Sequence, residues 1–169
     1  MSRISAEVVE AVWEEVNGLS PERGREEIDR VAQSQPHLLP FVLAMLHDCR
    51  PQAQELGVYL SYLVLKIFEH GSRTRLPRVP GAQLERQLES NEEAMGRLEA
   101  ASADVLRQAA AAQPSRQPEI LKLVVEALGE PPGDSGGAAL TEAEKAATFL
   151  TLKTVVDVLD DARGRLERA

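Results

Sequence analysis

The chain has 169 residues, and its 27 aspartates and glutamates outnumber its 19 lysines and arginines, which gives a formal net charge of −8. This acidic balance argues against a general nucleic-acid binder, because such a protein needs a basic face to neutralise phosphates. The single cysteine, Cys49, excludes an internal disulfide and any multi-cysteine metal cluster. The length is sufficient for one domain that buries a core without disulfides or metals.

The N-terminal region predicts two amphipathic helices. The first carries an apolar stripe at helical spacing, made of Val8, Val9, Val12, Trp13 and Val16. Ser20 and Pro21 begin the second, because serine caps free backbone N–H groups and proline at the first helical position loses no hydrogen bond. This second helix is mostly charged, so we expect it near the surface. The first residues do not have the pattern of a signal peptide, so we expect none and expect a cytoplasmic protein.

Residues 35–70 predict the first of two helix pairs. One helix begins at Pro36, and the next begins at Pro51 and ends near His70. The helix that begins at Pro51 is apolar around much of its circumference, which is typical of a central helix. Its most apolar run, residues 58–68, is far shorter than the ~20 residues that a membrane span requires.

A linker, a long helix and a second helix pair follow in the sequence. Residues 71–81 contain prolines, glycines and three arginines, as linkers do. Residues 82–112 predict one long helix with a heptad repeat of apolar positions, interrupted by Asn91 and Ser102. Residues 117–162 predict the second pair, whose last helix begins with a capping box at Thr141 and Glu144.

The two helix pairs resemble each other in sequence. Residues 35–46 align with residues 117–128 at an offset of 82, and both segments begin with Gln-Pro. Residues 53–63 align with residues 143–153 at an offset of 90, which places Tyr59 opposite Phe149. Any two amphipathic helices share apolar spacing, but the Gln-Pro starts favour an internal duplication.

These patterns together predict a single all-α domain over residues 1–169 with about seven helices. Two pseudo-repeated antiparallel helix pairs would form its core, accompanied by two N-terminal helices and one long linking helix. The arrangement resembles HEAT-like helical repeats in its paired helices, although two units are too few for a solenoid. Neither pair can bury its apolar face alone, so we expect the two pairs to stack.

Residues with catalytic or metal-binding chemistry form no recognisable pattern. His47, Asp48 and Cys49 place an imidazole and a thiol near a helix end, but no third metal ligand is predictable, so we expect an exposed or capping histidine. The chain contains no Glu-x-x-His pair and no GxGxxG, P-loop, HExxH or GxSxG motif. We therefore predict no catalytic residue, no cofactor and no metal.

Two groups of residues are candidates for partner binding. Arg73, Arg75 and Arg78 could present guanidinium groups to an acidic partner or to phosphate, or they could pair with the chain's own carboxylates. Asn91 and Ser102 are polar residues in a heptad repeat. Such residues fix the register of an intermolecular contact, or they mark a helix that packs only partly on its own domain. Both interpretations stay open at this point.

Four aromatic residues are candidates for a ligand pocket between the helix pairs: Trp13, Tyr59, Tyr62 and Phe149. Aromatic residues at helical spacing are more often part of the hydrophobic core, and this is the alternative. The sequence does not distinguish the two.

The leading functional hypothesis is a non-enzymatic, cytoplasmic protein-interaction or adaptor module that binds a protein partner or a second copy of itself. We expect neither nucleic acid nor membrane as a partner. Helical repeats commonly provide interaction surfaces, and no catalytic constellation is visible. One alternative is a small-molecule-binding or enzymatic helical bundle that uses the aromatic pocket. Another is an acidic regulator that neutralises a basic protein partner.

Overall fold

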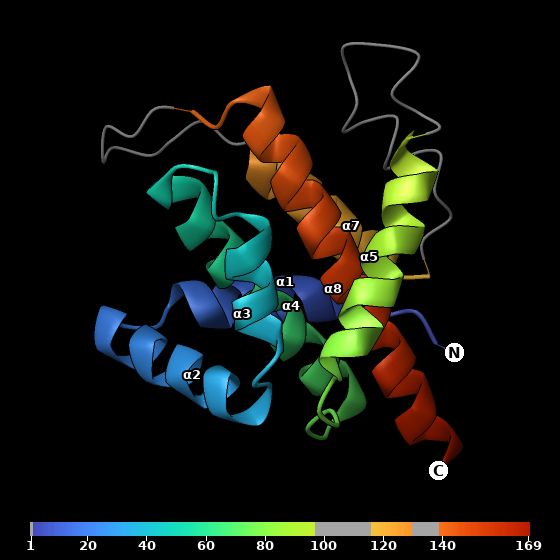
Figure 1. Ribbon diagram of the computed structural model, residues 1–169. Coiled ribbons are helices and arrows are strands. Elements are labelled where there is room, and N and C mark those ends of the chain that lie inside the picture. Colours follow the sequence, from blue (N-terminus) through green and yellow to red (C-terminus); the bar gives the residue numbers. More distant parts are fainter. Residues whose placement is uncertain (1, 97–115, 130–138) are drawn as a thin grey trace.

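The computed structural model describes residues 2–96, 116–129 and 139–169 (Figure 1). Within these residues every regular element is an α-helix, which confirms the all-α prediction. The helices are α1 (Ala6–Asn17), α2 (Pro21–Ser34), α3 (Leu38–Met45), α4 (Pro51–Ser72), α5 (Gly81–Gly96), α7 (Pro118–Gly129) and α8 (Glu142–Arg168).

The helix starts follow the local signals in the sequence. The Ser20 hydroxyl accepts a hydrogen bond from the Arg23 amide at 3.2 Å, with Pro21 at the first helical position of α2. The predicted capping box is present at the start of α8, where Thr141 and Glu144 accept from each other's backbone N–H groups. These side chains satisfy amides that have no partner within a helix.

Two helix boundaries differ from the prediction, because α3 begins at Leu38 and not at Pro36, and α8 ends later than expected. Helix α5 ends at Gly96 in the described part of the chain, and the remainder of the predicted long helix, up to residue 112, lies outside the described residues. Helix α8 continues to Arg168, beyond its predicted end at residue 162. The additional turns of α8 still contribute to the core, since Arg163 and Gly164 are buried there.

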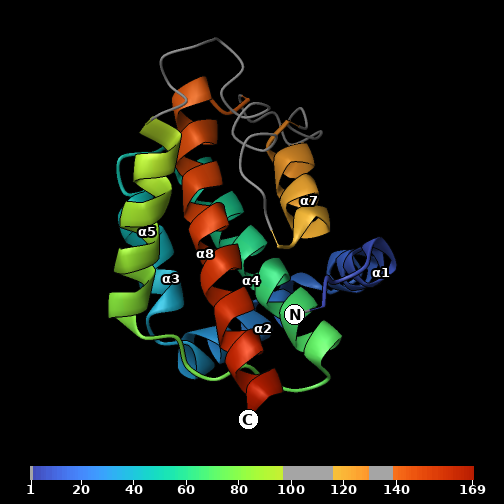
Figure 2. The same ribbon diagram turned by 90° about the vertical axis from the view of Figure 1, so that its right-hand side faces the viewer.

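Helices α4 and α8 lie side by side at the centre of the molecule (Figure 2). Helices α1 and α3 pack against α4, while α5 and α7 pack against α8. Both central helices contribute residues with no solvent exposure, among them Leu63, Ile67 and Phe68 from α4 and Leu152, Val155 and Leu159 from α8. The predicted central position of α4 is confirmed, and α8 shares this position. Helix α2 lies at the edge of the molecule (Figure 1).

Helix α8 carries three threonines in the core, and each hydroxyl is satisfied within the helix. Thr148, Thr151 and Thr154 donate to the backbone carbonyl oxygens four residues earlier, at 2.7, 2.7 and 2.9 Å. This local hydrogen bond removes the cost of burying an unpaired hydroxyl. The buried face of α8 can therefore be partly polar without losing stability.

A buried glutamine holds the segment that precedes α5. Gln35, which is 1% exposed, donates from Nε2 to the carbonyl oxygen of Pro77 and accepts at Oε1 from the amide of Val79, both at 3.0 Å. One side-chain amide thus pairs with two backbone groups of an extended segment. It satisfies polar groups that would otherwise be buried without partners.

A second buried glutamine holds the segment that precedes α1 in the same way. Gln117 accepts at Oε1 from the amide of Ile4 at 2.9 Å and donates from Nε2 to the carbonyl oxygen of Ser2 at 3.4 Å. Its Nε2 also donates to Asp160 at 2.7 Å. We call these two arrangements the Gln35 clamp and the Gln117 clamp.

We predict that Gln35→Ala lowers the free energy of unfolding by about 2–4 kcal/mol, because it leaves two buried backbone groups without partners. The matched control is Gln33→Ala, which changes an exposed glutamine two residues earlier and should cost less than about 0.5 kcal/mol. Urea denaturation of the two variants measures the difference. Equal losses would show that the clamp does not contribute.

Helices α3 and α4 approach closely at Gly57. A β-carbon at this position would lie 2.4 Å from Leu46 Cδ1 and 3.4 Å from Val42 Cγ1, and both neighbouring side chains are fully buried. Glycine at this position thus allows contact that a larger residue would prevent.

We predict that Gly57→Ala destabilises the protein by about 1–3 kcal/mol, because the buried Leu46 side chain has to move. Gly24→Ala in α2 is the control, since a β-carbon there meets no atom within 4 Å. This control should gain up to about 1 kcal/mol from better helix propensity. Thermal or urea unfolding measures both changes. If the two substitutions change the free energy of unfolding in the same direction, the prediction is wrong.

Candidate functional site

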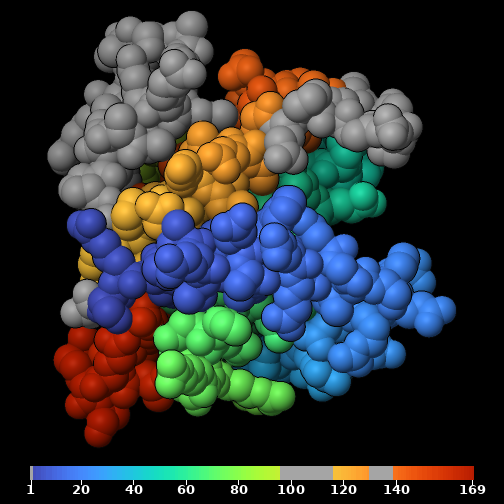
Figure 3. All heavy atoms as spheres, turned by 180° about the vertical axis from the view of Figure 1, so that it is seen from behind, coloured from blue at the N-terminus to red at the C-terminus, as the bar shows by residue number. Residues whose placement is uncertain are grey.

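A groove of about 620 Å³ lies between α1, α4 and α7. Figure 3 shows α1 and α7 side by side on this face of the molecule. Helices α1 and α7 form its walls and α4 forms its floor. Its lining residues are Ala6, Val9, Glu10, Trp13, Asn17, Leu56, Tyr59, Leu60, Glu119, Lys122, Leu123, Glu126 and Ala127.

Trp13 is the most distinctive apolar residue of this groove. Its residue surface is 39% exposed, while Val9 and Val12 on the same helix are buried in the core. A large indole that faces solvent beside an apolar floor leaves apolar area available for another molecule. Trp13 therefore contributes exposed apolar surface to the lining of the groove.

Tyr59 extends from α4 into the same groove. Its hydroxyl donates a hydrogen bond to Asn17 Oδ1 at 2.6 Å, and this joins the middle of α4 to the end of α1. The bond restricts the orientation of the phenol ring. Trp13 and Tyr59 thus both line the groove, one from α1 and the other from α4.

The charged residues of the groove lie on its two walls. Glu10 projects from α1, and Glu119, Lys122 and Glu126 project from α7. Glu10, Lys122 and Glu126 are exposed and Glu119 is half-buried. With three carboxylates and one ammonium group, the lining of the groove is negatively charged.

The structure brings together only two of the four aromatic residues that the sequence suggested for a pocket. Phe149 is 2% exposed and belongs to the core. Tyr62 is buried as well, and its hydroxyl donates to Glu27 at 3.4 Å on the side of α4 that faces α2. Burial, reinforced by the negative charge of Glu27, raises the pKa of Tyr62. Of the four aromatic residues, Trp13 and Tyr59 line the groove, whereas Phe149 and Tyr62 do not.

A small polar pocket of about 250 Å³ lies between α2 and α4. Glu27 lies beside it with Arg30 at 2.9 Å and Lys66 at 3.5 Å, so its carboxylate is neutralised within the chain. Glu69 also lines the pocket, and burial raises the pKa of its carboxyl group. The ion pair between Glu27 on α2 and Lys66 on α4 joins α2 to the edge of the core.

The three arginines of the linker are all exposed. Arg75 contributes to the polar pocket between α2 and α4. Arg73 ends α4 in a left-handed conformation, with φ at 56°. The segment therefore places Arg75 beside the chain's own carboxylates, while Arg73 and Arg78 are exposed to solvent.

Asn91 is buried against α8. Its amide donates to Thr154 Oγ1 at 3.1 Å and to Asp157 Oδ2 at 3.2 Å, and its carbonyl oxygen accepts from Gln87 at 3.2 Å. Lys153 pairs with the same Asp157 carboxylate. Asn91 thus takes part in a contact within the chain. Ser102, the other polar residue of the heptad pattern, lies outside the described residues.

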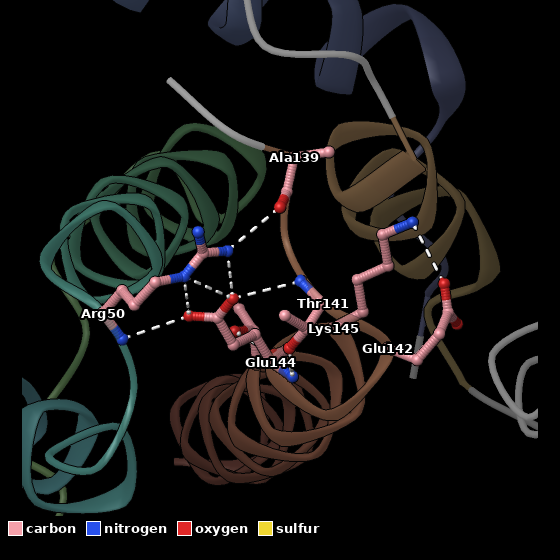
Figure 4. Close-up of polar contacts among 7 residues, drawn as sticks. Arg50, Ala139, Thr141, Glu142, Glu144 and Lys145 are labelled. Atoms are coloured by element: carbon pink, nitrogen blue, oxygen red, sulfur yellow. Dashed lines mark hydrogen bonds and ion pairs between the residues drawn. The ribbon is translucent and has the colours of Figure 1, made fainter.

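The starts of α4 and α8 are joined by an ion pair between Arg50 and Glu144 (Figure 4). Arg50 Nε donates to Glu144 at 3.0 Å, and its backbone amide donates to the same carboxylate at 3.1 Å. A further guanidinium nitrogen donates to the carbonyl oxygen of Ala139 at 3.0 Å. The hydrogen bond from Arg50, followed by that from the Thr141 amide, lowers the pKa of Glu144 to about 2.

We predict that Glu144→Gln reduces the acid sensitivity of the protein. In the wild type this carboxylate stabilises the fold above its ordinary pKa of 4.5, and the stabilisation is lost as the pH falls through the folded-state pKa of about 2. Urea midpoints measured from pH 7 to pH 2 should therefore fall less steeply in Glu144→Gln, which starts from a lower value at pH 7.

Glu142→Gln is the matched control for this experiment, because Glu142 lies in the same helical turn with a side chain that is 80% exposed. It should reproduce the wild-type pH profile. If Glu144→Gln does so as well, the Arg50 contact has no role in acid stability.

The residues with metal-binding or nucleophilic chemistry are dispersed. His47 is exposed, as expected for a surface histidine, and its Nε2 lies 3.0 Å from Asp48 Oδ1. Cys49 is half-buried, and burial followed by the nearby Glu144 charge raises the pKa of its thiol. A raised pKa makes a thiol less reactive. Among the described residues, no group of three or more histidine, cysteine, aspartate or glutamate side chains is placed to hold a metal ion.

Comparison with known proteins provides no relative. No family model matches the chain, no curated protein is similar to it, and no solved structure resembles it. In the part of the chain that the structure describes, no helix combines the length and the apolar composition needed to cross a membrane.

Proposed function

We propose that the protein is a non-enzymatic interaction module whose α1/α4/α7 groove receives an apolar segment of a partner protein. The observation that carries this proposal is the position of Trp13, a large and substantially exposed aromatic residue beside an apolar floor. Tryptophan and tyrosine supply a large share of the binding energy at protein interfaces. In this groove both residues come from rigid helices.

The dimensions of the groove suit a short helix. Helix α1 spans 12 residues, and a helix of this length extends about 18 Å, which is three turns. A partner helix of similar length could place apolar residues at i, i+3 or i+4 and i+7 against the floor.

A small-molecule ligand or substrate is the second candidate, and the groove supports it less well. Sites for small molecules combine an apolar cavity with a few polar groups that converge on the ligand. In this groove the Tyr59 hydroxyl already donates to Asn17, and the charged groups lie on the walls. An extended apolar surface between two helices fits a protein segment better.

We also propose a finer description of the fold, in which the chain is a tandem duplication of one helical unit. When α3 and the turn after it are aligned with α7 at the offset of 82, the buried positions of the two segments coincide. Buried Leu38, Leu39, Val42 and Leu46 correspond to buried Ile120, Leu121, Val124 and Leu128. The clamping glutamines, Gln35 and Gln117, correspond at the same offset.

The clamps extend the proposed duplication to α1 and α5, which the sequence pattern placed outside the repeated pairs. At an offset of 75, buried Ile4 and Val9 correspond to buried Val79 and Leu84. For the central helices the N-cap residues Arg50 and Thr141 support an offset of 91, one more than the sequence alignment used. At this offset Tyr59 corresponds to half-buried Leu150 and not to the buried Phe149.

In this description the first copy covers residues 2–72 and the second covers residues 77–168. The copies contact each other reciprocally, because α1 of the first contacts α7 of the second while α3 of the first contacts α5 of the second. Reciprocal contacts are typical of a two-fold rotation and not of the head-to-tail stacking in a solenoid. They therefore favour a fused pseudo-dimer over a HEAT-like array.

Trp13 is the one tryptophan of the chain, so its fluorescence reports directly on the groove. We predict that a partner protein, identified by affinity capture and then purified, shifts the Trp13 emission to shorter wavelength and protects it from acrylamide. Trp13→Leu should weaken binding at least tenfold, as expected for a central aromatic anchor (roughly 1.4 kcal/mol or more).

The matched control is Leu43→Ala, because Leu43 is an exposed apolar residue on α3, outside the groove. It should leave the affinity unchanged. A partner that binds without affecting Trp13 emission, and with equal affinity to Trp13→Leu, would contradict the proposed function.

A further inference from the structure

The groove differs from the corresponding surface of the second copy at several positions. This inference rests on the proposed function and uses the offsets given above. Trp13 corresponds to Leu88, Glu119 to His37 and Glu126 to Ala44. Helix α5 packs on α8 as α1 packs on α4, although its residue at the Trp13 position is a leucine. The fold therefore does not require the indole or the α7 carboxylates of the groove.

The positions of the carboxylates are suited to a helix lying between α1 and α7. Glu119 and Glu126 are seven residues apart, so they lie on one face of α7 about 10 Å from each other, two turns along the helix. Glu10 lies on the opposite wall, on α1. Lys122 is the one cation among the described lining residues. An occupant would therefore have carboxylates on both sides and an apolar floor beneath it.

We propose that the occupant of the groove is an amphipathic helix of a partner protein, with lysines or arginines on both sides of its apolar stripe. The apolar stripe would pack on Trp13, Tyr59 and the α4 floor. Its basic side chains would lie near Glu10 on one wall and near Glu119 and Glu126 on the other. Charge complementarity of this kind selects partners and accelerates their association. The same carboxylates repel the phosphates of nucleic acids and anionic lipids.

The test uses two fluorescein-labelled model helices of about 14 residues, slightly longer than the 12 residues of α1. Both carry leucines at i, i+3, i+4 and i+7. One has lysines on both flanks of this stripe, and its twin has glutamates at the same positions. Fluorescence anisotropy with the full-length protein at low salt should show that the lysine helix binds at least about tenfold more tightly than the glutamate helix.

Variants of the protein separate the groove from the general negative charge of the chain. The double variant Glu119→Gln/Glu126→Gln should weaken binding of the lysine helix by about three- to tenfold, as expected for the loss of two exposed charge pairs. The matched control, Glu89→Gln/Glu92→Gln, removes two exposed carboxylates from α5 and should leave the affinity unchanged. An equal effect of the two double variants would overturn the proposal.

The remaining outcomes distinguish this proposal from the proposed function. If both model helices bind equally and Trp13→Leu abolishes both, the basic occupant is wrong while the interaction groove stands. If neither helix binds, or if Trp13→Leu binds the lysine helix as the wild type does, both proposals fail. Light scattering that shows a dimer of the wild type and a monomer of Trp13→Leu would assign the groove to a second copy of the chain and overturn the basic occupant.

Discussion

The arrangement of the helices depends on the Glu144 carboxylate, which serves the starts of two helices at once. It accepts from the Thr141 amide at the start of its own helix and from the backbone amide of Arg50 at the start of α4. The Arg50 guanidinium supplies the compensating charge. Because α1 and α3 pack on α4 while α5 and α7 pack on α8, fixing these two starts positions the remaining core helices. A negative charge is also favourable beside the positive ends of two helix dipoles.

Several buried polar side chains elsewhere in the described residues have partners of a similarly specific kind. The threonines of α8 bond to their own helix, Asn91 bonds to Thr154 and Asp157, and the two clamping glutamines bond to backbone. A satisfied polar group in a core disfavours alternative packings, because any shift would leave it without a partner. These contacts select one arrangement of helices whose apolar faces alone would allow several.

Much of the local structure was predictable from the sequence. The apolar periodicity located the helices, and Ser20 and Thr141 located two helix starts, because capping is decided by a few adjacent residues. The partner of Glu144 was not predictable in the same way, since Arg50 lies 94 residues away and has no motif of its own. The capping box already accounts for a glutamate at position 144, so nothing in the sequence indicated its additional contact with Arg50. Gln35 and Gln117 were recognised as repeated residues, but their backbone partners lie on distant extended segments.

The groove was predictable only in part, for a physical reason. Trp13 and Tyr59 were recognised as aromatic residues, but periodicity does not show which side of an apolar helix stays uncovered. On α4, Tyr59 faces the groove and Tyr62 faces Glu27, although the two residues are less than one turn apart. The outcome depends on how α1, α2 and α7 are placed around α4. The carboxylates of α7 belong to no motif in the sequence, and they form one wall of a groove only because α1 lies opposite them.

The two glutamine clamps also determine how the molecule can come apart. Gln35 belongs to the first half of the chain and holds residues 77–79 of the second, while Gln117 belongs to the second half and holds residues 2–4 of the first. Each half therefore depends on the other to order the segment that leads into its own first helix. Neither half can unfold while the other keeps all of its hydrogen bonds. Such mutual dependence is expected to couple the unfolding of the two halves, so that neither behaves as an independent unit.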